Sequence, residues 1–103
     1  MNPIVDFELV EETKQKDTTG QTISTKKYTE TIGKKKSVYQ KEFFQAAQSG
    51  LRPECVIETS AFNYNGERLV RINGKELSIY RTFLLGTDKI DLFIGERVGN
   101  EDG

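Results

Sequence analysis

The chain has 103 residues, of which 35% are hydrophobic and 30% are charged, and 15 basic and 16 acidic side chains give a net charge of −1. A chain of this length forms one domain, and its low hydrophobic content predicts a thin core that is helped by partners in an assembly. The balanced charge argues against general nucleic-acid affinity, which depends on an excess of Lys and Arg. The chain has no His and only one cysteine, Cys55, which excludes histidine-based acid–base or metal chemistry and an internal disulfide.

The N-terminal segment turns acidic within a few residues, and no stretch of the chain approaches about 20 consecutive apolar residues. We therefore expect neither a signal peptide nor a transmembrane helix. On this basis we expect the protein to remain in the compartment where it is made.

The first third of the chain predicts two strands joined by a turn. Residues 4–12 alternate between apolar and polar side chains, which is typical of a half-buried strand. Polar and small residues from Asp17 to Gly20 predict the turn. Residues 22–32 are rich in Thr and only weakly apolar, which favours a strand at the edge of a sheet.

Residues 37–50 predict a helix between the second and third strands. Ser37 and Gln40 fit a capping box at its start, and apolar side chains recur at helical spacing after them. Gly50 is suited to the left-handed C-terminal cap. Pro53 prevents the helix from continuing.

After Pro53 the period of two returns and predicts four more strands, over 54–62, 67–72, 75–83 and 90–98. The pairs Asn65-Gly66 and Asn73-Gly74 favour tight hairpin turns, so we expect the first three of these strands to form a meander. Strict alternation predicts that Phe83 faces inward with Leu77 and Ile79. It also places Arg81 on the inner side, either at the end of the sheet or paired with an acidic group.

Together these elements predict one mainly β domain over residues 1–103. We expect a small antiparallel β-barrel of about six strands with one helix inserted between strands 2 and 3, at about 37–50. The acidic tail at 99–103 is expected to be frayed.

Isolated chemical motifs in the chain are weak. The run GKKKS at 33–37 lacks the earlier glycine of a phosphate-binding loop, whose position is occupied by Tyr28. A solvated basic turn is the favoured interpretation, and a basic loop facing an acidic partner or DNA stays open. Cys55 is interpreted as a buried structural residue. We expect no enzyme activity, no catalytic residues, no metal site and no cofactor.

Five segments carry a resemblance to a known family: SVYQKEFFQAAQSGLRPE at 37–54, FNYNGE, INGKEL, IYRTF and the closing DLFIGERVG. In this order they resemble the head-tail joining proteins of long-tailed phages, also called head-closure or stopper proteins, over nearly the whole chain. The resemblance implies a structural virion protein, a small β-barrel of the phage neck that is made in the host cytoplasm. Such proteins form a ring, dodecameric in the assembled neck, that helps to retain packaged DNA and provides the surface on which the tail docks.

The resemblance also implies the partners. These are copies of the chain itself, portal and adaptor proteins above the ring, and tail terminator or other tail proteins below it, with no membrane. A DNA contact in the channel stays open, as does channel gating by the segment 32–53. Six residues are expected to contact neighbouring subunits or the channel: Lys34, Lys35, Lys36, Phe44, Gln48 and Arg52.

The alternative function is a small β-barrel binding module for single-stranded nucleic acid. Such modules stack bases on aromatic side chains of an open strand face, with basic residues beside them. Tyr64, Tyr80 and Phe93 are the aromatic residues that we expect to serve this purpose if the alternative holds.

Overall fold

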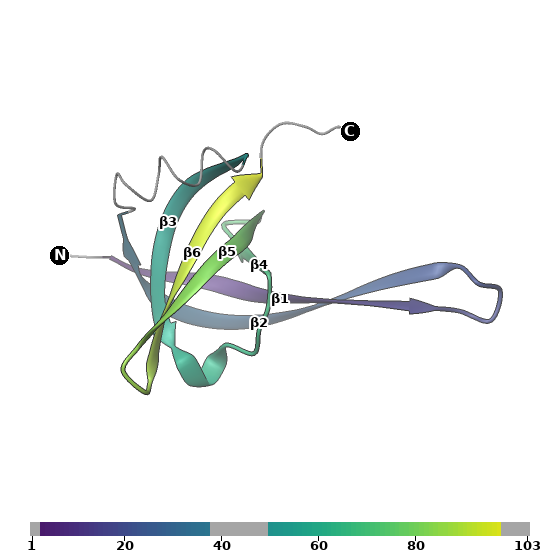
Figure 1. The fold of residues 1–103 in the computed structure, drawn as a ribbon, viewed down its shortest axis with the longest axis horizontal. Helices are drawn as coiled ribbons and strands as arrows, with labels where there is room; N and C mark the ends of the chain where they lie inside the picture. The colour runs from purple at the N-terminus through teal and green to yellow at the C-terminus, as the bar shows by residue number, and fades with distance from the viewer. Residues whose placement is uncertain (1–2, 38–49, 98–103) are drawn as a thin grey trace.

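The computed structural model describes residues 3–37 and 50–97 of the chain. These residues form six strands and one short helical turn: β1 (Ile4–Lys16), β2 (Thr22–Lys36), β3 (Leu51–Ser60), the 3-10 turn η1 (Ala61–Asn63), β4 (Leu69–Ile72), β5 (Lys75–Leu85) and β6 (Lys89–Arg97). All neighbouring strands are antiparallel, and the order β1-β2-β3-β6-β5-β4 returns to β1, which makes the sheet a closed barrel (Figure 1). The prediction of a mainly β domain with six antiparallel strands is confirmed.

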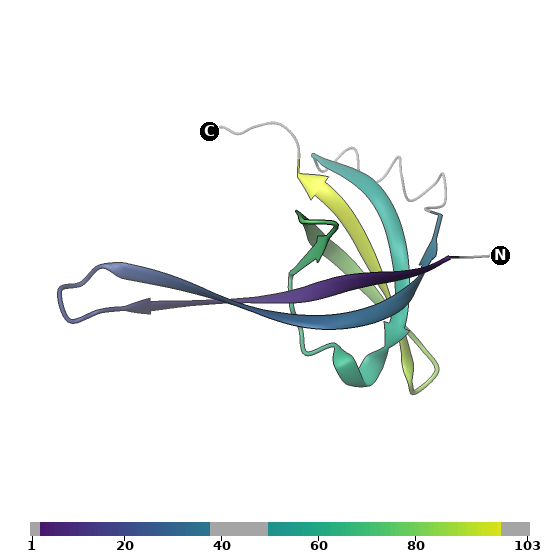
Figure 2. The ribbon, with the colours of Figure 1, turned by 180° about the vertical axis from the view of Figure 1, so that it is seen from behind.

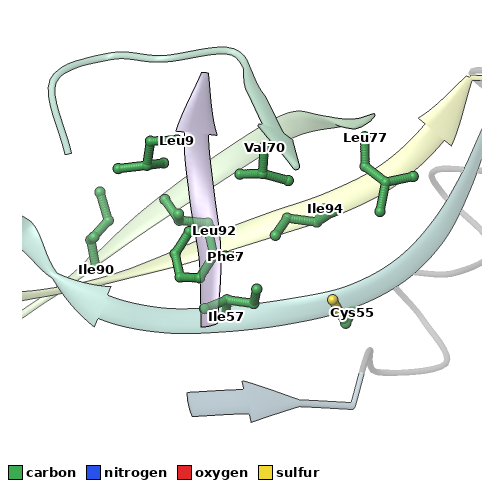
Figure 3. Packing of buried hydrophobic residues seen from close by; sticks show 9 residues of the cluster. All are labelled: Phe7, Leu9, Cys55, Ile57, Val70, Leu77, Ile90, Leu92 and Ile94. Carbon is green, nitrogen blue, oxygen red and sulfur yellow. The ribbon is translucent and has the colours of Figure 1, made fainter. Parts of the chain in front are cut away.

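The inner face of the closed sheet carries a single layer of buried side chains. Nine residues from β1, β3, β4, β5 and β6 form it: Phe7, Leu9, Cys55, Ile57, Val70, Leu77, Ile90, Leu92 and Ile94 (Figure 3). Alternation along each strand places them on one side, as the period of two predicts. The thin core expected from the composition is therefore one layer deep.

β2 adds no side chain to this layer, because a glycine stands where it approaches β3. A Cβ atom on Gly33 would overlap Ile57 Cγ2 and lie 2.8 Å from the carbonyl oxygen of Glu58 and 3.2 Å from Phe7 Cε1. The missing side chain lets the backbone of β2 lie directly against β3 and the core. The interpretation of β2 as a weakly apolar strand agrees with this arrangement.

The β1–β2 hairpin is much longer than the part of it that belongs to the closed sheet. β1 pairs with β2 along all its 13 residues, but it pairs with β4 only through Glu8, Leu9 and Val10. β2 pairs with β3 only through its last three residues. The two strands consequently run on as a two-stranded ribbon that projects from the body (Figure 2). We call residues 11–27 the arm.

A bulge in β5 reverses the face that we predicted for its second half. The register with β6 shifts between Ile79 and Arg81, so that Arg81 lies opposite Phe93 and Phe83 lies opposite Asp91. The prediction that Phe83 faces inward is wrong, since its side chain is 56% exposed. The predicted inward position of Arg81 is wrong too, and its guanidinium lies 4.1 Å from the centre of the Phe93 ring. One extra residue in a strand exchanges the faces of all residues that follow it.

Only one of the two Asn-Gly pairs closes a hairpin. Asn73 and Gly74 have φ angles of 53° and 80° and join β4 to β5, as a type I′ turn requires. The prediction that Asn65-Gly66 folds the third strand onto the fourth is wrong, because β3 pairs with β2 and β6 whereas β4 pairs with β1 and β5. Asn65 instead donates its backbone N–H to Glu67 Oε1 over 2.8 Å, within a loop that carries the chain from η1 to β4.

The helix predicted over 37–50 and the tail at 99–103 lie outside the described residues, except for the two helix ends. Of these, Gly50 has a φ of 77°, the left-handed conformation expected of it. In the described ranges, η1 is the one helical segment. None of the helical structure in those ranges has the length and apolar character needed to span a bilayer.

We predict that Leu92→Ala lowers the free energy of unfolding by about 2–5 kcal/mol, because Leu92 is fully buried in the single core layer. The matched control is Leu84→Ala, the same change at a side chain that is 60% exposed, with an expected effect within about 0.5 kcal/mol. Urea denaturation of both variants measures the difference. Equal effects would show that the core is not where the structure places it.

Gly33→Ala is expected to destabilise the protein by about 1–3 kcal/mol, because the new methyl group meets Ile57 and the backbone of Glu58. Thr29→Ala, at an exposed position of the same strand, is expected to change stability by no more than about 0.5 kcal/mol. Thermal unfolding followed by circular dichroism compares the two. A neutral Gly33→Ala variant would contradict the close approach of β2 to β3.

Candidate functional site

Of the three predicted contact lysines at the end of β2, Lys36 forms ion pairs within the protein itself. Its Nζ lies 3.2 Å from Glu58 Oε1 on β3 and 2.9 Å from Asp91 Oδ1 on β6. The hydrogen bond from Lys36 lowers the pKa of the Glu58 carboxyl. Partial burial tends to lower the pKa of Lys36, but its hydrogen bonds to Asp91 and Glu58 outweigh burial and raise it. Lys36 therefore ties three strands together.

Lys34, Lys35 and Arg52 remain accessible to a partner. Both lysines are exposed, and neither forms an ion pair with the part of the chain that the structure describes. Arg52 is 59% exposed along its side chain, with Nη2 3.7 Å from Glu96 Oε1. A loose, exposed ion pair of this kind contributes little to stability. Arg52 can therefore leave Glu96 and bind a partner's carboxylate at a small cost in free energy.

The four predicted contact residues that the structure describes do not form one patch. Lys34 lies opposite Glu58, and Glu58 and Arg52 are six residues apart on β3, or about 20 Å. Phe44 and Gln48 lie outside the described residues. The contact role of all six residues stays a prediction.

The arm is the exposed feature that the sequence did not reveal as a separate element. All of its residues except Asp17 are exposed, on both faces of the ribbon. Over residues 22–33, the edge of β2 away from β1 has no strand partner within the described ranges. The sequence feature that could have predicted the arm is the polar, weakly apolar composition on both sides of the predicted turn, because such strands have no apolar face to bury. A long unpaired edge of this kind is a template for pairing with another chain.

The tip of the arm is a well-ordered turn. Asp17 Oδ1 accepts hydrogen bonds from the Thr19 backbone N–H at 2.9 Å, from Thr19 Oγ1 at 2.7 Å and from the Gln21 backbone N–H at 2.9 Å. The Thr19 hydroxyl, together with the Gln21 amide, lowers the pKa of the Asp17 carboxyl. Gly20 adopts a φ of 88°, which favours glycine. These contacts confirm the predicted turn and hold the two strands in register.

Three charged contacts fasten the base of the arm to β4 and β5. Arg71 Nε lies 2.6 Å from Glu8 Oε1, and the Arg71 guanidinium lies 4.1 Å from the centre of the Tyr28 ring. Lys26 Nζ lies 3.0 Å from Glu76 Oε2. The hydrogen bond from Arg71 lowers the pKa of Glu8. Within the described residues, the ribbon beyond these contacts is held by its own cross-strand pairs.

An acidic groove lies at the base of the arm. It has a volume of about 630 Å³ and is lined in part by Asp6, Glu8 and Glu30 and by Arg71 from β4. Three carboxylates and one guanidinium give these four side chains a net charge of −2. Ile32, 61% exposed, also lines the groove. The combination of uncompensated negative charge and an exposed apolar side chain is suited to a basic, partly apolar partner segment.

The three aromatic residues of the alternative function do not form an open stacking face. Phe93 is 6% exposed and lies beneath Arg81, with the Tyr80 ring edge-on at 6.3 Å between centroids. Tyr64 is half-buried and donates its hydroxyl to the backbone carbonyl of Glu67 over 2.8 Å. A base has no free aromatic face to stack on at Phe93.

Cys55 is 3% exposed in the core, which confirms its interpretation as a buried residue. Burial raises the pKa of its thiol. Among the described residues, no group of three or more Cys, Asp or Glu side chains is placed to hold a metal ion.

Comparisons with protein-family models, with curated protein sequences and with solved structures gave no match to this chain.

We predict that Lys36→Met lowers the free energy of unfolding at pH 7 by about 1–3 kcal/mol, because it leaves the facing carboxylates of Glu58 and Asp91 without their shared cation. Since the folded-state pKa of Glu58 is below its ordinary value of 4.5, the stabilisation is present above pH 4.5 and is lost as the pH falls through the folded-state pKa. The difference in the free energy of unfolding between wild type and variant should therefore become smaller as the pH falls. Urea denaturation between pH 7 and pH 3 measures this difference.

The control is Lys75→Met, at a side chain that is 57% exposed and lies 3.6 Å from Glu96. We expect this variant to behave like wild type at every pH. If Lys36→Met also had the stability of wild type at every pH, the ion pairs of Lys36 with Glu58 and Asp91 would be contradicted.

Proposed function

We propose that the chain is a structural virion protein at the head-tail junction of a long-tailed phage. In this role it forms a ring below the portal and adaptor, helps to retain packaged DNA and provides the tail-docking surface. The proposal combines the sequence resemblance with a closed six-stranded sheet, which we assign to the head-closure type of β-barrel. The single observation that supports it most is the exposed arm that projects from this small body.

The arm supports a subunit of an assembly for an energetic reason. A two-stranded ribbon without a third strand or a covering layer is marginally stable in water. Residues 13–25, which make up most of the arm, have neither in the described structure. Docking on a neighbouring subunit removes the exposed edge from water and adds the free energy of association to that of folding.

The thin core points the same way. One layer of nine side chains stabilises the body, while several large apolar side chains stay outside it, among them Ile4, Ile32, Phe62, Phe83 and Leu84, each more than half exposed. Ile4 and Ile32 line one pocket together, and neighbouring exposed apolar side chains mark a surface that a partner can cover. Lys34 lines the same pocket and supplies a polar contact beside it, while Lys35 and Arg52 are exposed at other positions.

Heads of the phage that encodes the chain, made without it, are expected to package DNA, to leak it and to remain without tails. Electron microscopy and a nuclease-protection measurement of head DNA read out both defects. Adding the purified wild-type chain should restore tailed particles. Filled and tailed particles made in its absence would end the proposal.

A variant with a shortened arm tests the feature that carries the proposal. Thr13 and Thr25 lie opposite each other, so an Asn-Gly turn can join them in place of residues 14–24. We expect the body to fold with an unchanged thermal unfolding midpoint, because these residues do not touch the core, and we expect tail joining to be lost. Full activity of this variant would remove the arm from the proposal.

A further inference from the structure

We propose that the tip of the arm docks into the acidic groove at the base of the arm of a second copy of this chain. The proposal rests on the ring assembly inferred above for the identity of the partner, and it names the two surfaces that meet. It follows from three properties of the ribbon: the charge of its tip, the charge of its base and the distance between them.

The tip is basic on one face. Lys14 and Lys16 are two residues apart on β1 and therefore project to the same side of the ribbon. Both are exposed, and neither has an ion pair with the described residues. The carboxylate of Asp17, next to Lys16, accepts three hydrogen bonds within its own loop. Glu12, two residues before Lys14, accepts a hydrogen bond from the Ser24 hydroxyl. The opposite face of the tip carries Ile23, which is 49% exposed.

The groove has the opposite charge, and its one lining cation, Arg71, is bound to Glu8. Glu8 and Glu30 are directly opposite each other in the β1–β2 register, and like charges in this position destabilise a strand pair. Arg71 compensates Glu8 alone, so that Glu30 and the neighbouring Asp6 have no ion-pair partner in the described ranges. A lysine from outside would relieve this repulsion. Ile32 in the groove offers an apolar contact for the other face of an inserted tip.

The separation of tip and groove makes the contact intermolecular. Eight residues of extended strand separate Glu8 from Lys16, which is about 26 Å. The molecule is 52 Å long including the arm, so this leaves about 26 Å for the body along the same direction. A second copy whose groove receives the tip is thus displaced by about one body length and does not overlap the first. A tip-to-groove contact uses different surfaces on the two copies, so contacts made in one direction generate a ring or a filament, whereas two reciprocal contacts would close a dimer.

Charge reversal tests the pairing. Lys14→Glu/Lys16→Glu gives an acidic tip, and Asp6→Lys/Glu30→Lys gives a basic groove. We expect each variant alone to self-associate at least about tenfold more weakly than wild type, since its tip and groove then carry like charges. Mixing the two variants should restore assembly, because each tip then meets a groove of opposite charge on the other variant. Sedimentation velocity at about 0.01 M and 0.15 M salt measures association and its screening.

The matched controls are Arg68→Glu and Glu54→Lys, equivalent changes at exposed positions outside the tip and the groove. They should assemble like wild type. The proposal is overturned if both reversals assemble normally, if the mixture does not recover, or if the wild-type chain stays monomeric at about 1 mM in low salt.

Disulfide cross-linking locates the contact directly. Thr18→Cys places a thiol at the tip and Ile32→Cys places one in the groove, while the native Cys55 is buried and does not compete. After oxidation and denaturation, the double variant should give a ladder of covalent oligomers beyond the dimer, and each single variant should give no covalent oligomer. Dimers from either single variant would instead indicate a symmetric contact between two tips or two grooves and would sink the proposal.

The two proposals fail in different ways. If the ladder forms but heads made without the chain stay filled and tailed, the tip-to-groove contact holds and the head-tail function is wrong. If heads require the chain but the double variant gives no ladder when assembled on them, the function holds and the contact is wrong.

Discussion

The structure depends on a short seam at which the sheet closes. β4 has four residues, and only three positions of β1, Glu8 to Val10, pair with it. At the centre of the seam Leu9 lies opposite Val70, and both side chains are completely buried. On the outer side Arg71 binds Glu8 across the same two strands. If this seam opened, the single layer of core side chains would lose one wall and would be exposed to water.

The length of the seam also explains the arm. Because β4 begins only at Leu69, which lies opposite Val10, β1 has no second neighbour beyond Val10, whereas its pairing with β2 continues to Lys16. The ribbon therefore leaves the body at the point where the seam ends. Its polar faces keep it soluble, and its edges and basic tip are left for a neighbour. A body stabilised by one thin layer and an arm stabilised by little beyond its own pairs both gain from assembly, which is the physical basis of the proposed ring.

Two local irregularities decide which side chains face outward. Gly33 brings β2 against the core without a side chain, so that one strand of the ring is nearly free of apolar residues and can continue into a polar arm. The bulge in β5 turns Phe83 outward and places Arg81 over Phe93. The outer surface thus obtains an exposed aromatic side chain that strict alternation would have buried. Both features act on surfaces that a partner would meet, and neither changes the strand order.

Local sequence determined the strands, the turn at Asp17–Gly20, the hairpin at Asn73-Gly74 and the alternating core positions of β1, β3 and β6, because these depend on side-chain period and on backbone preferences of neighbouring residues. Only the tertiary structure decided that β4 pairs with β1 and not with β3, and where the β5 bulge reverses the faces. It also decided that Lys36 pairs with Glu58 and Asp91, whereas Lys34 and Lys35 form no ion pair within the described residues. The tertiary structure further decided where β1 stops pairing with β4, which is the point at which the arm begins and beside which the acidic groove lies. Pairing between distant strands is set by closure of the core, a property of the whole chain that no short window of sequence contains.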